Sequence, residues 1–251
     1  MVNLFLLFKK FFNINNENKI VQFSNVSFDA SLWEIFMSLY HGAALYIPAK
    51  TIILDTQDFC KYIDTHQIDT LTLPPVYARQ LGNYKLSSIK NFIVAGSVSY
   101  YEDSDKWKNN INFYNAYGLT ETTICAAVYN VNKGACDAYQ NELPVGKPAP
   151  NTKLFVLDKW MRLAPIGVRG ELYISGKCLS DGYINKKLLS DERFIPNKHY
   201  KDNIMYRTGD VALWLEDGNI VVTGRNDEQI KIKAEQERLA EEKRKAEKKA
   251  A

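Results

Sequence analysis

The sequence predicts an α/β fold, in which a mostly parallel sheet with flanking helices precedes a smaller β-barrel-like subdomain and a charged helical tail. Up to about residue 142, β-branched and aromatic runs alternate with helical patterns, which is typical of a parallel sheet. From residue 143 the apolar runs are short and separated by turn residues, as in a meander or small barrel. The end of the chain is rich in alanine and charged helix formers. We therefore expect three parts, residues 1–142, 143–227 and 228–251.

The elements of the first part follow from local patterns. Ser31-Leu32-Trp33-Glu34 has the form of a capping box, and apolar residues at helical spacing follow it, so a helix is expected over about residues 31–40. The β-branched run 68–73 ends at two prolines, which predicts a strand that stops there. The same criteria predict strand 43–47, helix 58–66, helix 76–82, strand 91–95, helix 100–108 and strand 111–114.

The second part is expected to contain short strands over residues 153–157, 170–175, 182–184, 205–208, 211–215 and 220–223. Asp217-Gly218 predicts a hairpin turn before the last of them, because both residues tolerate positive φ. The tail from Ala234 onward has Leu239 as its only large aliphatic residue. It predicts a solvated helix or an appended linker rather than a membrane-surface or calmodulin-binding helix, since those need an apolar face.

Composition narrows the class of partner. A net charge of +3 on 251 residues, without basic residues and aromatics interleaved, argues against nucleic acid. The four cysteines and three histidines lack the spacings of a disulfide framework or a zinc site. The apolar start is interrupted by Lys9-Lys10, lacks signal-peptide features and is too short to span a bilayer. We expect a cytoplasmic protein with a small-molecule ligand and no membrane partner.

The segment 115–123 is the main functional signal. It follows an apolar run and brings an amide, an aromatic ring, a glycine, a hydroxyl and a carboxylate together within nine residues. These groups suit a base, a phosphate and a metal ion bound with them. In a parallel sheet, ligands bind at the carboxyl ends of the strands, where this segment is expected.

Four segments in order resemble the adenylate-forming superfamily, and most of all the amino-acid adenylation domains of nonribosomal peptide synthetases. The resemblance covers roughly residues 5–233 and is specific because independent turns would not reproduce the whole order. The segments are Phe28-Asp29-Ala30-Ser31-Leu32-Trp33-Glu34, Asn115-Ala116-Tyr117-Gly118-Leu119-Thr120-Glu121, Gly170-Glu171-Leu172-Tyr173-Ile174, and Tyr206-Arg207-Thr208-Gly209-Asp210 with Gly224-Arg225-Asn226-Asp227.

The resemblance implies that ATP, with Mg²⁺, activates an amino acid as aminoacyl-AMP, which then passes to the phosphopantetheine arm of a separate peptidyl carrier domain. Thr120 and Glu121 would be catalytic, contacting the α-phosphate and holding Mg²⁺ respectively. The other implied nucleotide contacts are the turn at Gly96, Asn115 and Tyr117 at the adenine, the close-approach Gly118, Asp210 at the ribose, and Arg225. Asp227 matches the hinge. Read singly, Asp210 is more typical of a turn residue, and Glu121 of a helix-start acid favoured by the helix dipole.

The resemblance also implies an amino-acid pocket. Asp29 matches the carboxylate that pairs with the substrate ammonium group, which favours an amino acid over the substrates of acyl-CoA ligases. The other matching positions are small or apolar and include one ring, a combination similar to phenylalanine-activating pockets. They are Ala30, Trp33, Thr72, Ile93, Ala95, Ala116, Ile124 and Cys125. The alternative is that Trp33, Ile93 and Ile124 are core residues.

Two family segments have no match in this sequence, namely a phosphate-binding loop upstream of Phe28 and a downstream domain that supplies a lysine. We therefore also consider a truncated, non-catalytic adenylation fold that binds nucleotide, ligand or a partner chain without turnover. The missing halves of its own domain are then candidate partners, because the sheet is expected to have uncovered apolar faces.

Overall fold

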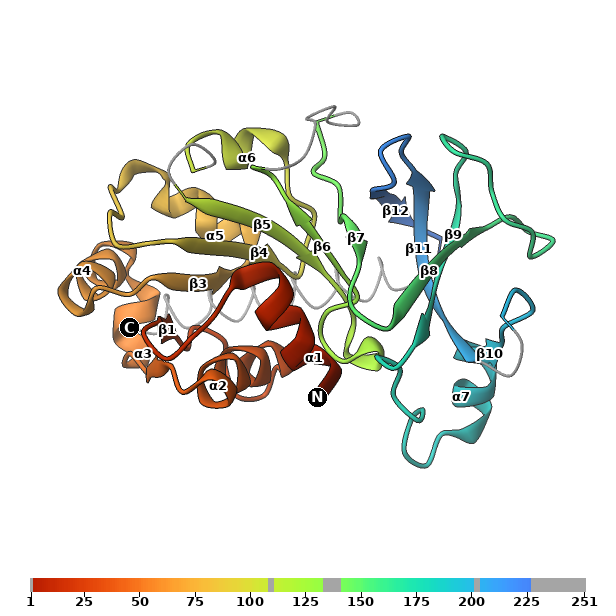
Figure 1. The fold of residues 1–251 in the computed structure, drawn as a ribbon, viewed down its shortest axis with the longest axis horizontal. Coiled ribbons are helices and arrows are strands. Elements are labelled where there is room, and N and C mark those ends of the chain that lie inside the picture. The colour runs from red at the N-terminus through yellow and green to blue at the C-terminus, as the bar shows by residue number, and fades with distance from the viewer. Residues whose placement is uncertain (1, 108–110, 133–140, 201–203, 227–251) are drawn as a thin grey trace, which may run out of the picture.

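A computed structural model describes residues 2–107, 111–132, 141–200 and 204–226, which form two sheets side by side (Figure 1). The first sheet has the strand order β2-β1-β3-β4-β5-β6-β7 and the second β10-β11-β9-β8, with β12 paired to β11. The strands are β1 (Lys19–Val21), β2 (Ala44–Tyr46), β3 (Thr70–Leu73), β4 (Asn91–Ala95), β5 (Asn112–Tyr117), β6 (Ala127–Asn130), β7 (Lys147–Pro148), β8 (Thr152–Leu157), β9 (Gly170–Gly176), β10 (Phe194–Pro196), β11 (Ile204–Trp214) and β12 (Ile220–Arg225).

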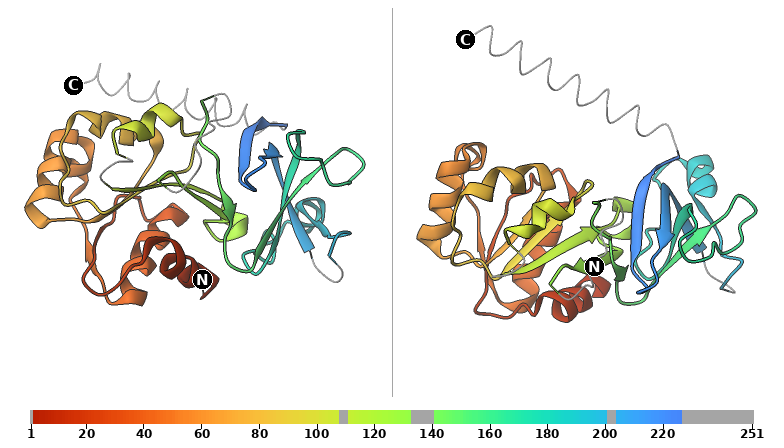
Figure 2. Two further views of the ribbon diagram at one scale, coloured as in Figure 1. Left: turned by 45° about the horizontal axis from the view of Figure 1, so that its top comes forward. Right: turned by 90° about the horizontal axis from the view of Figure 1, so that it is seen from above.

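Helices cover both faces of the first sheet, as Figure 2 shows. They are α1 (Val2–Leu7), η1 (Phe8–Phe12), α2 (Asp29–His41), α3 (Lys50–Leu54), α4 (Thr56–His66), α5 (Pro75–Gln80), η2 (Leu81–Asn83) and α6 (Tyr101–Asp105). Two further short helices are η3 (Thr120–Thr122), directly after β5, and α7 (Lys187–Arg193), before β10. Strands β1 to β5 run parallel, and β6 and β7 extend the sheet antiparallel.

The alternation of side chains along each strand produces two separate cores on this sheet. On β4, Phe92 and Val94 pack with residues of α4 and α5, whereas Ile93 packs with α1, η1 and α2. The second of these cores is rich in rings, and Phe8 and Phe12 both contact Trp33 edge-on. Such edge-to-face aromatic pairs stabilise a core beyond the area they bury.

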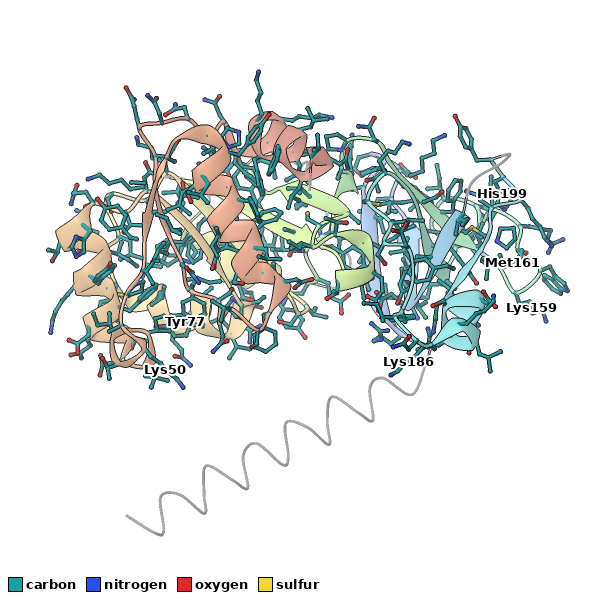
Figure 3. The ribbon with its side chains drawn as sticks, turned by 90° about the horizontal axis from the view of Figure 1, so that it is seen from below. Lys50, Tyr77, Lys159, Met161, Lys186 and His199 are labelled. Carbon is teal, nitrogen blue, oxygen red and sulfur yellow. The ribbon has the colours of Figure 1, made fainter. Side chains whose placement is uncertain are left out.

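The second sheet is antiparallel and curls into half of a barrel (Figure 1). Its inner face packs through Val156, Leu172 and Ile220 onto Ala126 and Ala127 at the start of β6. The far end of the sheet carries Lys159, Met161 and His199, whereas Lys50 and Tyr77 lie at the opposite end of the molecule (Figure 3). The two sheets therefore meet where β5 turns into β6.

The predicted fold class is confirmed, and most predicted elements exist. The first sheet extends to Pro148 and the second begins at Thr152. The runs 205–208 and 211–215 form the single strand β11, because a bulge carries the strand across Gly209. The predicted strand 182–184 is wrong, since these residues form a turn held by Ser190.

The predicted capping box is also wrong. Helix α2 begins at Asp29, two residues before Ser31, and the Ser31 hydroxyl donates to the Phe28 carbonyl oxygen at 2.8 Å. Glu34 does not turn back to the helix start, because its carboxylate accepts hydrogen bonds from Phe23 and Ser24. Strand β1, with only three residues, was not predicted. The tail that was predicted to be helical lies outside the described residues. Within the described ranges, no helix is long and apolar enough to cross a bilayer.

Candidate functional site

The turn between β5 and β6 forms the junction of the two sheets. It is closed by the Ala126 amide, which donates to the Tyr117 carbonyl at 2.8 Å, and by the Thr122 amide, which donates to that of Leu119 at 2.9 Å. Thr123 and Ile124 have φ of 53° and 71°, in the left-handed region that most side chains avoid. The tight reversal brings Ile124 back over Gly118 and exposes the Thr120 side chain.

Three predicted nucleotide residues meet at this junction. The Tyr117 hydroxyl of β5 donates to Asp210 of β11, and Arg225 of β12 forms an ion pair with the same carboxylate, Nη1 to Oδ1, at 2.8 Å. Burial, together with the neighbouring charge of Asp210, holds the pKa of Tyr117 well above its usual value. The phenol therefore stays protonated and donates to the carboxylate.

A bulge in β11 directs the Asp210 side chain toward the junction of the two sheets. The pairing of β11 with β9 shifts register between Arg207 and Val211. The Thr208 hydroxyl replaces the missing ladder bonds, since it donates to Leu172 O at 2.7 Å and accepts from the Asp210 amide at 3.0 Å. Gly209 lies between them with φ of 78°. A bulge of this kind redirects a side chain out of the normal alternation of a strand.

The predicted metal-binding residue lies on the same turn. Glu121 is half-buried, and its Oε1 accepts a hydrogen bond from the Tyr183 hydroxyl at 2.6 Å. In the part of the chain that the structure describes, no three His, Cys, Asp or Glu side chains gather into a metal cluster. A Mg²⁺ ion bound with a nucleotide needs only one or two protein carboxylates, because phosphates and water complete its octahedron. Glu121 fits that requirement.

Besides Tyr117, two residues are expected near the adenine, and they lie in different environments. Gly96 directly follows β4 in an exposed position with φ of 92°, which glycine adopts without strain. Asn115 is buried, and its amide nitrogen donates to Pro144 O at 2.9 Å while its oxygen accepts from the Ser99 hydroxyl at 3.2 Å. Asn115 thus ties β5 to the segment that precedes β7.

Most of the predicted pocket residues gather in the ring-rich core. Within that core, the Trp33 indole donates to the Thr72 hydroxyl at 3.0 Å, which fixes the ring against β3. Four of the predicted pocket residues are buried members of this core, namely Trp33, Ile93, Ala116 and Cys125. Two more, Ala95 and Ile124, are half-buried and pack against it. Ala30 is half-buried one turn before Trp33. The alternative interpretation of Trp33 and Ile93 as core residues is therefore compatible with their burial.

Asp29 differs from the other pocket residues. It is half-buried in the first turn of α2, and among the described residues its carboxylate has no hydrogen-bond or ion-pair partner. A carboxylate here is favoured by the helix dipole. It is also a carboxylate available to a cationic ligand. The predicted hinge residue Asp227 lies outside the described residues.

Two residues with strong interactions were not predicted as site residues. Tyr183 contacts Glu121 across the junction, and the sequence marked it only as part of the predicted strand 182–184. Glu34 is fully buried, and its carboxylate accepts from the Phe23 and Ser24 amides at 3.1 and 3.0 Å. Burial outweighs these bonds and raises the pKa of Glu34 to about 8.

The raised pKa of Glu34 gives a pH-dependent stability. The folded state holds the carboxyl proton of Glu34 more tightly than the unfolded chain does. The stabilisation that follows is therefore fully present below the unfolded-state pKa of 4.5 and is lost as the pH rises through the folded-state pKa of about 8. The free energy of unfolding should fall with pH across this window, by up to about 1.4 kcal/mol per pH unit. Urea denaturation of the wild type and Glu34→Gln between about pH 5 and pH 9 measures it. A pH-independent difference between the two proteins would contradict the assignment.

Comparison with known proteins adds independent findings. The family model described as "AMP-binding enzyme" matches residues 1–184. Gramicidin S synthase 1 of Brevibacillus brevis is 39% identical over 239 residues, which are 95% of this chain and 22% of that protein. The chain thus spans about a fifth of the length of that relative.

Two solved structures share the fold. The Vibrio cholerae adenylation domain AlmE, in complex with glycyl-adenosine-5'-phosphate, has a TM-score of 0.78 at 26% identity, over 90% of this chain and 44% of that chain. NpsA-ThdA of Klebsiella oxytoca, an artificially fused adenylation-PCP di-domain NRPS, has a TM-score of 0.76 at 26% identity, over 85% of this chain and 40% of that chain.

Proposed function

The chain belongs to the AMP-binding enzyme family, and we propose that it adenylates an amino acid with a large apolar side chain, phenylalanine above all. In this reaction the carboxylate of the amino acid displaces pyrophosphate from the α-phosphate of ATP and forms aminoacyl-AMP. The observation that carries the proposal is the meeting of Tyr117, Asp210 and Arg225 at the junction, three residues from Thr120.

The junction supports nucleotide binding. Asp210 is a buried carboxylate held by Arg225 and Tyr117, so its orientation is fixed before a ligand arrives. Such a preorganised acceptor suits the two ribose hydroxyls. The half-buried Tyr117 ring offers a flat surface to adenine, and the exposed Thr120 hydroxyl is available to the α-phosphate. Glu121 would hold Mg²⁺, which when bound screens the phosphate charge against the attacking carboxylate.

The start of α2 supports an amino acid as the second substrate. The Asp29 carboxylate is half-buried and has no partner in the described structure, so a substrate ammonium group could pair with it at little desolvation cost. A fatty or aryl acid has no group to make this pair. The neighbouring small and apolar residues would favour a large hydrocarbon side chain, since burying a phenyl ring contributes about 1.5–3 kcal/mol.

The proposed next partner is a peptidyl carrier domain, whose phosphopantetheine thiol would take the aminoacyl group and release AMP. The fused adenylation-PCP structure that shares this fold supports a carrier domain as the partner. ATP, Mg²⁺ and the carrier arm are thus the proposed cofactors.

Calorimetry with non-hydrolysable sulfamoyl adenosines tests the substrate. The phenylalanyl analogue should bind at least about tenfold more tightly than the glycyl analogue, because only the former buries a ring. Asp29→Asn should weaken the phenylalanyl analogue by about tenfold while leaving AMP unaffected. Asp58→Asn is the matched control, because the Asp58 carboxylate forms an exposed ion pair with Lys61.

Each outcome has a distinct meaning. Equal affinity for both analogues would contradict the phenylalanine assignment, and binding of neither would contradict the adenylation site. Phenylalanine-dependent ATP–pyrophosphate exchange then tests turnover. Tight binding of the analogue without exchange would support the alternative of a fold that binds its ligands but does not turn them over.

A further inference from the structure

The side chain of Glu121 is held from the second sheet. Its Oε1 lies 2.6 Å from the Tyr183 hydroxyl, which itself lies 3.2 Å from the Tyr206 hydroxyl. An ionised carboxylate only accepts hydrogen bonds, and a phenol has one proton to donate. If Tyr183 donates to Glu121, Tyr206 must donate to Tyr183. The three groups thus form a directed chain from Tyr206 to Glu121.

Both phenols are suited to remain donors. Burial raises the pKa of Tyr206 strongly, and the neighbouring Tyr183 and Glu121 add to the effect. Burial and the hydrogen bond to Glu121 also raise the pKa of Tyr183.

The backbone around Tyr183 is fixed as well. Its amide donates to the Ser190 hydroxyl at 2.8 Å, and its ring packs edge-on against Phe194 at 5.9 Å between centroids. Phe194 in turn contacts Tyr206, with centroids 4.9 Å apart. The Tyr183 hydroxyl therefore has a defined position relative to β10 and β11.

The segment 178–183 also clamps the turn that carries Glu121. The Ser180 amide donates to the Glu121 carbonyl at 2.9 Å, and the Thr123 hydroxyl donates to the Cys178 carbonyl at 2.7 Å. Backbone and side chain of Glu121 are thus fixed by the same segment.

We infer that Tyr183 is a positioning residue, which holds one carboxylate oxygen of Glu121 so that the other is presented to a divalent cation bound with the nucleotide. The inference rests on the proposed function, since it concerns the metal side of the same nucleotide site. Hydrogen-bond partners of a metal-binding carboxylate orient it, and their loss typically weakens metal affinity or activity 10–100-fold.

The test is calorimetry of ATP binding in Mg²⁺ and, separately, in EDTA. Tyr183→Phe removes one hydroxyl and keeps the ring contact with Phe194. We expect it to weaken binding of ATP in Mg²⁺ by about tenfold and to leave binding in EDTA unchanged. Tyr200→Phe is the matched control, because Tyr200 is half exposed and packs against Lys153 at the far end of the sheet.

Glu121→Gln separates this inference from the proposed function. If Glu121→Gln loses the Mg²⁺ dependence and Tyr183→Phe does not, the positioning role is wrong and the metal site stands. If neither variant alters it, the metal site of the proposed function is also wrong. Should Tyr183→Phe fail to fold by near-UV circular dichroism, Tyr206→Phe must show a smaller weakening in Mg²⁺ alone, and equal binding to the wild type would overturn the inference.

Discussion

Replacing Asp210 with alanine is expected to weaken AMP binding about 100-fold, because the carboxylate that would accept both ribose hydroxyls is removed. The same change should lower the free energy of unfolding by about 3 kcal/mol, since it leaves the largely buried Arg225 guanidinium without its carboxylate. The Tyr117 hydroxyl loses its acceptor as well. This is the substitution with the largest expected effect on function.

Two variants separate the two effects of this substitution. Asp210→Asn keeps the shape of the side chain and an acceptor for Tyr117, so it should recover part of the stability but not the AMP affinity. Asp58→Ala, which breaks only the exposed ion pair with Lys61, should change neither quantity measurably. Wild-type AMP affinity in Asp210→Asn, measured by calorimetry, would contradict the proposed ribose contact.

Gly118→Ala is expected to lower the free energy of unfolding by about 3 kcal/mol without removing any polar contact. A Cβ at this position would lie 2.2 Å from the Ile124 carbonyl oxygen and 2.6 Å from the Cys125 Cα, and both are backbone atoms. The turn could accept the methyl group only by opening. In thermal denaturation, the midpoint should fall by about 6–12 °C.

Gly82→Ala is the matched control for this prediction. No atom lies within 4 Å of a Cβ built at Gly82. The substitution should therefore leave the midpoint unchanged or raise it slightly, because alanine reduces the entropy of the unfolded chain. A Gly118→Ala protein as stable as Gly82→Ala would show that the turn is looser than its hydrogen bonds indicate.

Short-range patterns were sufficient for four of the five parallel strands of the first sheet, whereas the antiparallel β6 and β7 were not predicted. Strand β4 was predicted at its observed bounds, and α4 to within two residues, because their apolar periods are regular. Strand β1 was missed because three residues are too few to establish a period. The capping box failed for a different reason, since the Glu34 carboxylate accepts from Phe23 and Ser24 in the loop before α2 and not from the helix start.

The candidate site shows the same division between what local patterns predict and what depends on contacts elsewhere in the chain. The order of motifs was enough to place the chain in its family and to propose residues for a nucleotide site. It did not reveal that Asn115 hydrogen-bonds to the carbonyl of Pro144 or that Tyr183 contacts Glu121, which is 62 positions away. No periodicity in the chain encodes a contact at that separation.

The sequence alone therefore determined the class of fold, the family and the kinds of side chain available at the junction, because these depend on local patterns and on motif order. Only the tertiary structure decided which of these side chains share hydrogen bonds. Tyr117 and Asp210 lie on different sheets, and their meeting depends on the bulge at Thr208 and the packing of Ala126 against the second sheet. The hydrogen bond between them forms only when the two sheets are packed together, because each sheet supplies one of the two side chains.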